Sequence, residues 1–243
     1  MPAERAEEAR ARMLALFPHG FEEVDAADGV ELVAYTDAAG EEQLWHVFGG
    51  ARAEDVAADW HDRWKSFHRP VCVGPFWIGP PWMEPPADAT AVLIEPGRAF
   101  GTGTHPTTRL VVELLLELDR GSLLDLGCGS GVLSIVAAKL GFAPVVALDA
   151  DDNAVAATRT NAAANGVHID VSVADVLEAQ LPAADVALAN ITRPTLEALA
   201  PRLRAGRLIG SGYLPTDEAE LEGFRHVRRI TRDSWAADLY EAA

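Results

Sequence analysis

The sequence predicts an α/β protein: a doubly wound sheet of about seven strands, preceded by a small α+β domain. The first observation is the stretch 122–149. It reads as strand, glycine turn, helix, strand and acid, the plan of one nucleotide-binding half of such a sheet. Short apolar runs then alternate with helical patterns from residue 90 to residue 210. Finally, runs at 224–231 and 234–240 are typical of a terminal antiparallel pair.

The pattern of residues 1–65 predicts the small α+β domain. Residues 4–17 place apolar side chains on one side of a helix, which Pro18 and Gly20 end. Alternating apolar and polar residues predict three strands, and a second helical pattern follows them: strands at 21–25, 30–35 and 43–48, and a helix at 53–64.

The segment 66–89 is rich in proline and tryptophan, and we expect it to be an ordered linker. Proline at this density breaks helices and keeps the chain extended. Tryptophans are rarely left in solvent, so Trp77 and Trp82 are expected to pack against the protein. The alternative is that these aromatic side chains line a substrate groove.

Residues 90–243 form the predicted main domain. Its strands are expected at 90–94, 122–126, 144–148, 168–173, 185–189, 207–210, 224–231 and 234–240. Its helices are expected at 106–118, 132–140, 151–165, 194–203 and 216–221.

The glycine turn and its flanking acids favour one kind of nucleotide. Gly127 and Gly129 allow a tight turn that a ligand can approach closely, but the spacing is G-x-G-x-G rather than the G-x-G-x-x-G of dinucleotide sites. The carboxylate of Asp125 would repel a pyrophosphate, whereas it suits an ammonium group. Asp149 lies 22 positions after Gly127, where a carboxylate can bind both hydroxyls of a ribose. S-adenosylmethionine, which has an adenosine, an ammonium group and no phosphate, is therefore the predicted cofactor.

Two further polar residues follow strands of the predicted sheet, where ligands of such sheets bind. Asp175 is placed to accept a hydrogen bond from the adenine amino group, and the alternative is a helix cap or a turn. Asn190 is predicted to lie where a methyl acceptor must come, and its alternative is a cap for the helix that begins near residue 194.

The loop 95–108 is rich in glycine and threonine and leads into a helix with Pro106 in its first turn. The amides and hydroxyls of Thr107 and Thr108 are suited to bind the carboxylate of a methionine tail, as helix N-termini bind anions. The alternative is that the threonines merely cap the helix.

Composition limits the partners of the chain. It has 243 residues, 49% of them hydrophobic, which is typical of a globular protein. With 20 Lys and Arg against 37 Asp and Glu, the net charge of −17 argues against nucleic acid and favours a basic partner, although solubility explains it equally.

The sequence also indicates the cellular compartment of the protein and whether it binds a metal. Cys72 and Cys128 provide no disulfide framework, the first residues are charged rather than apolar, and no apolar run reaches membrane-spanning length. We therefore expect a cytoplasmic protein. The seven histidines have no metal-ligand spacing, so no metal is predicted.

Four stretches together carry a resemblance to a known family: EPGRAFGTGTHPTT, DLGCGSGVLSIVAAKLG, ALDADDNAV and LANIT. In this order and spacing they closely resemble the methyltransferases of ribosomal protein L-eleven, over most of residues 60–243. The resemblance implies a Rossmann-like class I methyltransferase sheet and a cofactor site that includes Thr108, Gly127, Asp149 and Asn190. It also implies methylation of lysine side chains and of an N-terminal amine on a basic ribosomal protein, and a role for the small domain, residues 1–65, in recognising that substrate.

The chemistry expected of such a site is chiefly positioning. An amine attacks only when neutral, whereas lysine in water has a pKa of about 10.4. We predict Asn190 as the catalytic residue, because its carbonyl can orient the amine without stabilising the ammonium as a carboxylate would. No general base is evident. His105 is a candidate, and a packed or exposed loop histidine is the alternative.

Other functions fit the sequence less well. Base N-methyltransferases carry prolines and a stacking aromatic after the strand-four Asn or Asp, whereas Ile191, Thr192 and Arg193 follow Asn190 here. A dehydrogenase is disfavoured by Asp125 and by the glycine spacing. A non-enzymatic cofactor-binding module, a methyltransferase of another protein lysine, and an RNA or small-molecule N-methyltransferase remain the alternatives.

Overall fold

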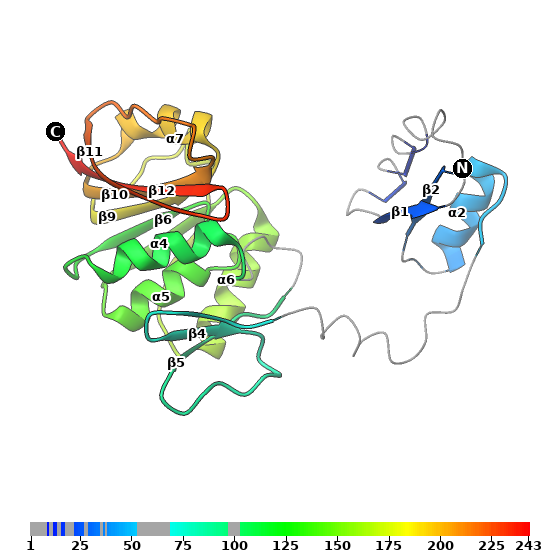
Figure 1. Ribbon diagram of the computed structural model, residues 1–243, viewed down its shortest axis with the longest axis horizontal. Coiled ribbons are helices and arrows are strands. Elements are labelled where there is room, and N and C mark those ends of the chain that lie inside the picture. The colour runs from blue at the N-terminus through cyan, green and yellow to red at the C-terminus, as the bar shows by residue number, and fades with distance from the viewer. Residues whose placement is uncertain are drawn as a thin grey trace. The chain divides into compact units, whose positions relative to one another are not determined.

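The computed structural model divides the chain into two compact units, Met1–His61 and Asp62–Ala243 (Figure 1). It describes residues 9, 12–13, 16–17, 22–26, 29–34, 36, 38–52, 69–96 and 103–243. We describe each unit by itself.

In the first unit, β1 (Glu22–Ala26) and β2 (Gly29–Val33) pair antiparallel, which confirms the two predicted strands. The strand predicted at 43–48 is wrong, because these residues belong to helix α2 (Ala38–Phe48). The buried or half-buried residues of this helix include Gly40, Leu44, Val47 and Phe48. They recur every three to four residues, which places them on one side of a helix. Among residues of the predicted helix 4–17, Ala9 and Met13 are helical and buried. The helix predicted at 53–64 lies outside the described residues.

The second unit begins with a small three-stranded sheet. Strand β3 (Val71–Val73) pairs antiparallel with β4 (Phe76–Gly79), which pairs parallel with β5 (Thr90–Leu93). Thus the proline-rich segment contains two short strands, and Trp77 is packed with only 4% of its surface exposed. The strand predicted at 90–94 is confirmed, but it pairs with β4 rather than with the main sheet.

The main sheet of this unit has seven strands and is flanked by helices, which confirms the predicted α/β fold class. Its strands lie in the order β11-β12-β10-β9-β6-β7-β8. All neighbours from β10 to β8 are parallel, whereas β12 runs antiparallel to both β10 and β11. The bounds are β6 (Leu123–Leu126), β7 (Val145–Asp149), β8 (Asp170–Val173), β9 (Ala184–Asn190), β10 (Ala205–Tyr213), β11 (Phe224–Arg232) and β12 (Trp235–Ala242).

Helices cover both faces of this sheet (Figure 1). One face packs against α4 (Pro106–Leu116), α5 (Val132–Leu140) and α6 (Asp152–Ala164), and the other against α7 (Arg193–Leu199), which continues into the 3-10 turn Ala200–Arg202. Alternate side chains of a strand point to opposite faces. Accordingly, Leu123 belongs to the core under α4 and α5, and its neighbour Leu124 to the core under α7.

The helix predicted at 216–221 is wrong, because these residues form turns and irregular chain. Arg229 explains the difference, since its guanidinium donates to the carbonyl oxygens of Pro215 and Asp217 at 2.8 Å. A helix would use those carbonyls internally. Buried Leu221 anchors the segment to the α7 face.

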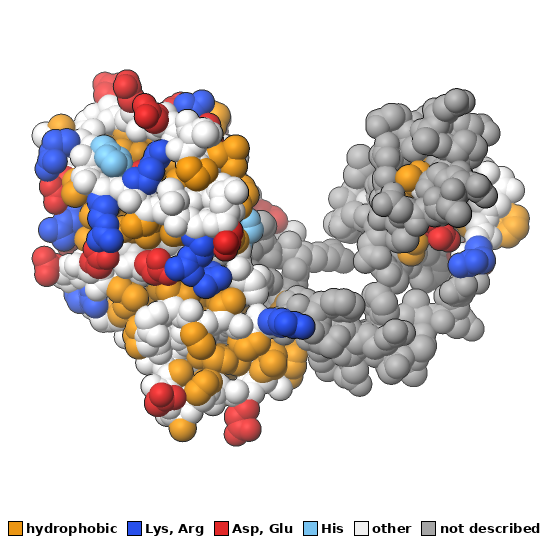
Figure 2. Space-filling model, in the orientation of Figure 1, with side chains coloured by type: hydrophobic (Ala, Val, Ile, Leu, Met, Phe, Trp, Pro, Cys, Tyr) orange, Lys and Arg blue, Asp and Glu red, His pale blue; other side chains and the backbone are white. Residues whose placement is uncertain are grey.

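The terminal strands are joined by ion pairs. Arg229 pairs at 2.8 Å with Asp238, a side chain with no solvent exposure that also accepts the Tyr213 hydroxyl at 2.8 Å. Arg228 of β11 pairs with Glu117, the C-cap of α4, and Arg232 of β11 pairs with Glu113 of α4. Figure 2 shows basic and acidic side chains interleaved over this part of the surface. None of the described helices is both long enough and apolar enough to cross a membrane.

Candidate functional site

The glycine turn follows β6 and is held in a conformation that side chains disfavour. Gly127, Gly129 and Gly131 have φ angles of 76°, 55° and 80°. The N–H of Gly127 donates to Leu148 O at 2.8 Å, which ties the turn to the end of β7. A Cβ on Gly127 would lie 2.8 Å from Cγ2 of Ile191, so the turn also lies against the residue that follows Asn190.

Asp149 ends β7 and faces the same turn. Its Oδ2 accepts the main-chain N–H of Gly129 at 2.9 Å, and its Oδ1 accepts the N–H of Asp151 at 3.0 Å. The side chain is therefore fixed and only half-buried. A carboxylate oxygen can accept more than one hydrogen bond, so both oxygens remain able to accept from the hydroxyls of a sugar.

Asp125 lies beneath the turn rather than at its surface. It is 1% exposed, and its Oδ2 accepts the hydroxyl of Ser134, the third residue of α5, at 2.5 Å. Burial raises the pKa of Asp125 to about 6, and the nearby Asp149 also raises it, while the hydrogen bonds from Ser134 lower it. Asp125 thus holds β6 to α5, and its expected interaction with a ligand ammonium stays a prediction.

Asn190 ends β9, next to β10, where it is paired in register with Ser211. The N-cap of α7 is Thr192, so the alternative interpretation of Asn190 as a cap is wrong. Its half-buried amide forms no hydrogen bond with any residue that the structure describes. The amide is therefore available to a ligand at the edge of the sheet.

The backbone after Asn190 is fixed from β10 as well as from the glycine turn. Ile191 donates its N–H to Ser211 O at 3.0 Å. Gly212 has a φ of 106° at an irregularity in the pairing of β10 with β12, and a Cβ on it would lie 2.2 Å from the carbonyl oxygen of Ile191. Only glycine fits at this approach.

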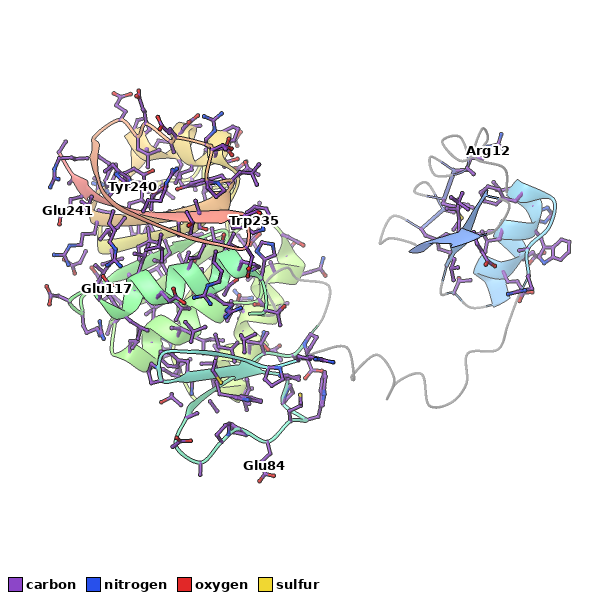
Figure 3. The ribbon with its side chains drawn as sticks, viewed as in Figure 1. Arg12, Glu84, Glu117, Trp235, Tyr240 and Glu241 are labelled. Carbon is purple, nitrogen blue, oxygen red and sulfur yellow. The ribbon has the colours of Figure 1, made fainter. Side chains whose placement is uncertain are left out.

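The first turn of α4 carries Thr107 and Thr108, both 1% exposed. His105, not a threonine, is the N-cap of α4: its Nδ1 accepts the N–H of Thr107 at 3.4 Å and lies 2.7 Å from the hydroxyl of Thr107. The ring of His105 also contacts the ring of Trp235 edge to face, 4.8 Å between centroids. Trp235 is the first residue of β12 (Figure 3). His105 is therefore packed, as in the alternative interpretation of this histidine. Residues 97–102 of the loop lie outside the described residues.

Asp175 follows β8 and is exposed. Its Oδ1 accepts the N–H of Leu177 at 2.8 Å, so it has the turn-capping role weighed as its alternative. The preceding residue, Ala174, donates its N–H to Asp149 O at 2.8 Å, which places Asp175 close to the end of β7. A contact of Asp175 with adenine stays a prediction.

Three strand ends thus meet at one edge of the sheet. Gly127 lies against Ile191, beside Asn190, and Gly129 is hydrogen-bonded to Asp149. This arrangement combines main-chain glycines, one fixed carboxylate and one unused amide, which suits a neutral or cationic nucleoside better than a phosphate. Among the residues that the structure describes, no three His, Cys, Asp or Glu side chains are grouped to hold a metal ion.

Comparison with known proteins agrees with this geometry. The family model described as ribosomal protein L11 methyltransferase (PrmA) matches residues 2–239. The chain belongs to the ribosomal protein L11 methyltransferase family. It is 41% identical over 196 residues to the ribosomal protein L11 methyltransferase of Aeromonas hydrophila, covering 72% of this chain and 65% of that protein. The relative from Vibrio cholerae is 41% identical over 182 residues, covering 68% of this chain and 60% of that protein. The chain therefore spans less than two thirds of the length of these relatives.

A solved member of the L11 methyltransferase family shares the fold. The ribosomal protein L11 methylase of Lactobacillus delbrueckii subsp. bulgaricus is 27% identical, with a TM-score of 0.66 over 71% of this chain and 98% of that one. The predicted class I methyltransferase fold is thereby confirmed.

Sequence reasoning missed three residues of this candidate site. Trp235 contacts His105, Ile191 contacts the glycine turn, and Gly212 contacts Ile191. Glycine at the end of an apolar run, as at Gly212, is a signal that a backbone approaches closely. Trp235 gives no such signal, because its partner lies far away in the chain.

Proposed function

We propose that this chain is a protein N-methyltransferase that uses S-adenosylmethionine to methylate amino groups of a ribosomal protein, the large-subunit protein L11. The observation that carries the proposal is the junction of Gly127, Asp149 and Asn190 at the edge of the sheet. Membership of the family supports the same activity and substrate.

The residues present fit the cofactor. Asp149 has lone pairs for the ribose, and the half-buried Gly127 and Gly129 carry no side chain of their own. Thr107 and Thr108, in the first turn of α4, are assigned to the methionine tail, and Asp175 to the adenine amino group. When bound, S-adenosylmethionine supplies a methyl group on a positively charged sulfur.

Asn190 is assigned to the acceptor amine. Its carbonyl accepts a hydrogen bond and so orients the nitrogen lone pair, and because the amide is neutral it does not stabilise the protonated amine. Removal of the amine from water lowers its pKa further towards the neutral, reactive form. The rest of the chain's contribution is to fix the position of Asn190, through Ile191 and Gly212.

Charge supports a basic protein rather than RNA as the partner. The net charge is −17, and all four arginines of β11, the most basic strand, pair with acidic side chains: Arg225 with Glu241, Arg228 with Glu117, Arg229 with Asp238 and Arg232 with Glu113. Both cysteines are free, which agrees with our assignment of the reaction to the reducing cytoplasm.

The test is transfer of a radiolabelled methyl group to purified ribosomal protein L11, with a cell extract separated into protein and RNA as a parallel acceptor. The proposal expects label in L11, at lysine side chains or the N-terminal amine. Label in RNA alone, or in a protein other than L11, would contradict the assigned substrate. The Asn190→Ala variant is the control: it should transfer little label, and its loss of transfer should be much larger than its loss of cofactor affinity.

A further inference from the structure

Helix α6 presents a polar stripe inside the protein. Thr158, Asn161 and the C-cap residue Asn165 lie three and four residues apart, so they share one side of the helix. Thr158 is 0% exposed and Asn161 is 2% exposed. Burial of polar side chains is unfavourable unless each is hydrogen-bonded, so the partners of this stripe show what it holds.

Two members of the stripe bind the main chain of the glycine turn. The hydroxyl of Thr158 donates to Gly129 O at 3.0 Å, and Nδ2 of Asn161 donates to Ser130 O at 2.8 Å. The main chain of the turn is therefore held by α6. Gly129 is the residue whose N–H binds Asp149.

The stripe also binds the end of β5. Oδ1 of Asn161 accepts the main-chain N–H of Glu95 at 3.0 Å. Asn165 binds both main-chain groups of Leu93, accepting its N–H at 2.9 Å and donating to its carbonyl at 2.6 Å. Of these three side chains, only Asn161 binds both the glycine turn and the chain after β5. Its amide connects Glu95 with Ser130, which lie 35 positions apart in the sequence.

Glu95 is the first residue of the loop 95–108, which leads to Thr107 and Thr108. We propose that Asn161 is a positioning residue for S-adenosylmethionine: by joining Glu95 to Ser130 it fixes the start of this loop against the glycine turn. A site held in its binding conformation loses less entropy when the ligand binds. Asn161 therefore raises cofactor affinity without touching the cofactor. This inference rests on the proposed function.

Asn165 offers a matched control, since it also binds β5 from the same face of α6 but has no bond to the glycine turn. Calorimetric titration of S-adenosylmethionine would be carried out on the full chain and on the variants Asn161→Ala and Asn165→Ala, with thermal unfolding measured in parallel. Both substitutions should lower the unfolding midpoint. Asn161→Ala should raise Kd about tenfold or more, and Asn165→Ala less than about twofold.

Asn161→Asp is the second variant, in case the alanine variant does not fold. Its carboxylate can still accept from Glu95 N–H, but when ionised it cannot donate to Ser130 O and repels it, so Kd should rise at least as much. An unchanged Kd in a folded Asn161 variant, or an equal rise for Asn165→Ala, would overturn the inference while the proposed function stands. Failure of the wild-type chain to bind the cofactor would instead overturn both.

Discussion

Ile191 packs against Gly127 so closely that a Cβ on Gly127 would lie 2.8 Å from Cγ2 of Ile191. This contact joins the two parts of the site that have different tasks. Gly127 belongs to the turn assigned to the cofactor, and Ile191 follows Asn190, which is assigned to the acceptor amine. A side chain at position 127 would therefore press on the residue that follows Asn190.

Replacement of Gly127 by alanine tests this contact. Its φ of 76° strains any side chain, and the added methyl group would push against Ile191. We expect a loss of stability of about 1–3 kcal/mol and a rise in the Kd for S-adenosylmethionine of about tenfold or more. Gly141→Ala is the control, because Gly141 has a φ of 95° but nothing within 4 Å of a Cβ. It should lose stability and keep its affinity, as measured by urea unfolding and calorimetry.

Gly212→Ala is expected to separate catalysis from cofactor binding. A Cβ here would meet the main-chain oxygen of Ile191 at 2.2 Å, so the backbone after Asn190 must shift. A displacement of about 1 Å can lower a rate about 100-fold. The turnover number should fall by that order, with a smaller change in cofactor Kd. Gly223→Ala, at a φ of 82° with open space, should retain its turnover number, and equal losses in the two variants would refute the idea.

Asp125 should make stability depend on pH in a particular direction. Burial raises the pKa of its carboxyl from 3.8 to about 6 in the folded state, so the folded chain binds more protons than the unfolded chain between these values. Its contribution to stability therefore falls as pH rises from about 4 to about 6, by on the order of 3 kcal/mol. Asn at this position cannot titrate. The free energy of unfolding of Asp125→Asn, minus that of wild type, should therefore increase as pH rises over this range. Urea unfolding at several pH values measures this difference. A difference that stays constant would contradict the prediction.

The Asp238 network should dominate the stability of the terminal strands. Burial alone would raise the pKa of Asp238, but hydrogen bonds from Arg229, His226 and Tyr213 outweigh burial and hold the pKa below its ordinary value. Asp238→Asn should cost about 3 kcal/mol at neutral pH, because Arg229 loses its charged partner.

The surface pair of Arg225 with Glu241 is the control for this network, and Glu241→Gln should cost less than about 1 kcal/mol. Since the pKa of Asp238 is lowered in the folded state, its stabilising effect is full above the unfolded pKa near 4 and is lost as pH falls below it. The difference between wild type and Asp238→Asn should therefore shrink in acid. A difference that persists unchanged at pH 3 would show that the ion pair is not responsible.

Local patterns predicted the seven-stranded sheet well, because the apolar residues of each element recur at the spacing typical of a strand or of a helix. The helix 132–140 and the strands on either side of it begin and end within one residue of their predicted bounds. Patterns failed where distant contacts decide the conformation. Arg229 takes the carbonyls of Pro215 and Asp217 that a helix would need.

The candidate site could be predicted only in part for the same reason. The strand-end positions Gly127, Asp149 and Asn190 follow from topology alone. The burial of Asp125 does not, because it depends on Ser134 of the next helix. Nor does the role of Asn161, since its partner Glu95 lies 66 positions away, just after a strand that sequence patterns assigned to the main sheet.

The most direct test of the cofactor site is a calorimetric titration of S-adenosylmethionine into the wild-type chain and the Asp149→Ala variant. Each hydrogen bond to a charged group contributes about 1.5–3 kcal/mol, so loss of the Asp149 carboxylate should weaken binding by about 10- to 100-fold or more. Asp152→Ala, which removes an exposed acid in the first turn of α6, should bind as wild type does. No heat of binding with the wild-type chain, or equal affinity with and without Asp149, would contradict the account.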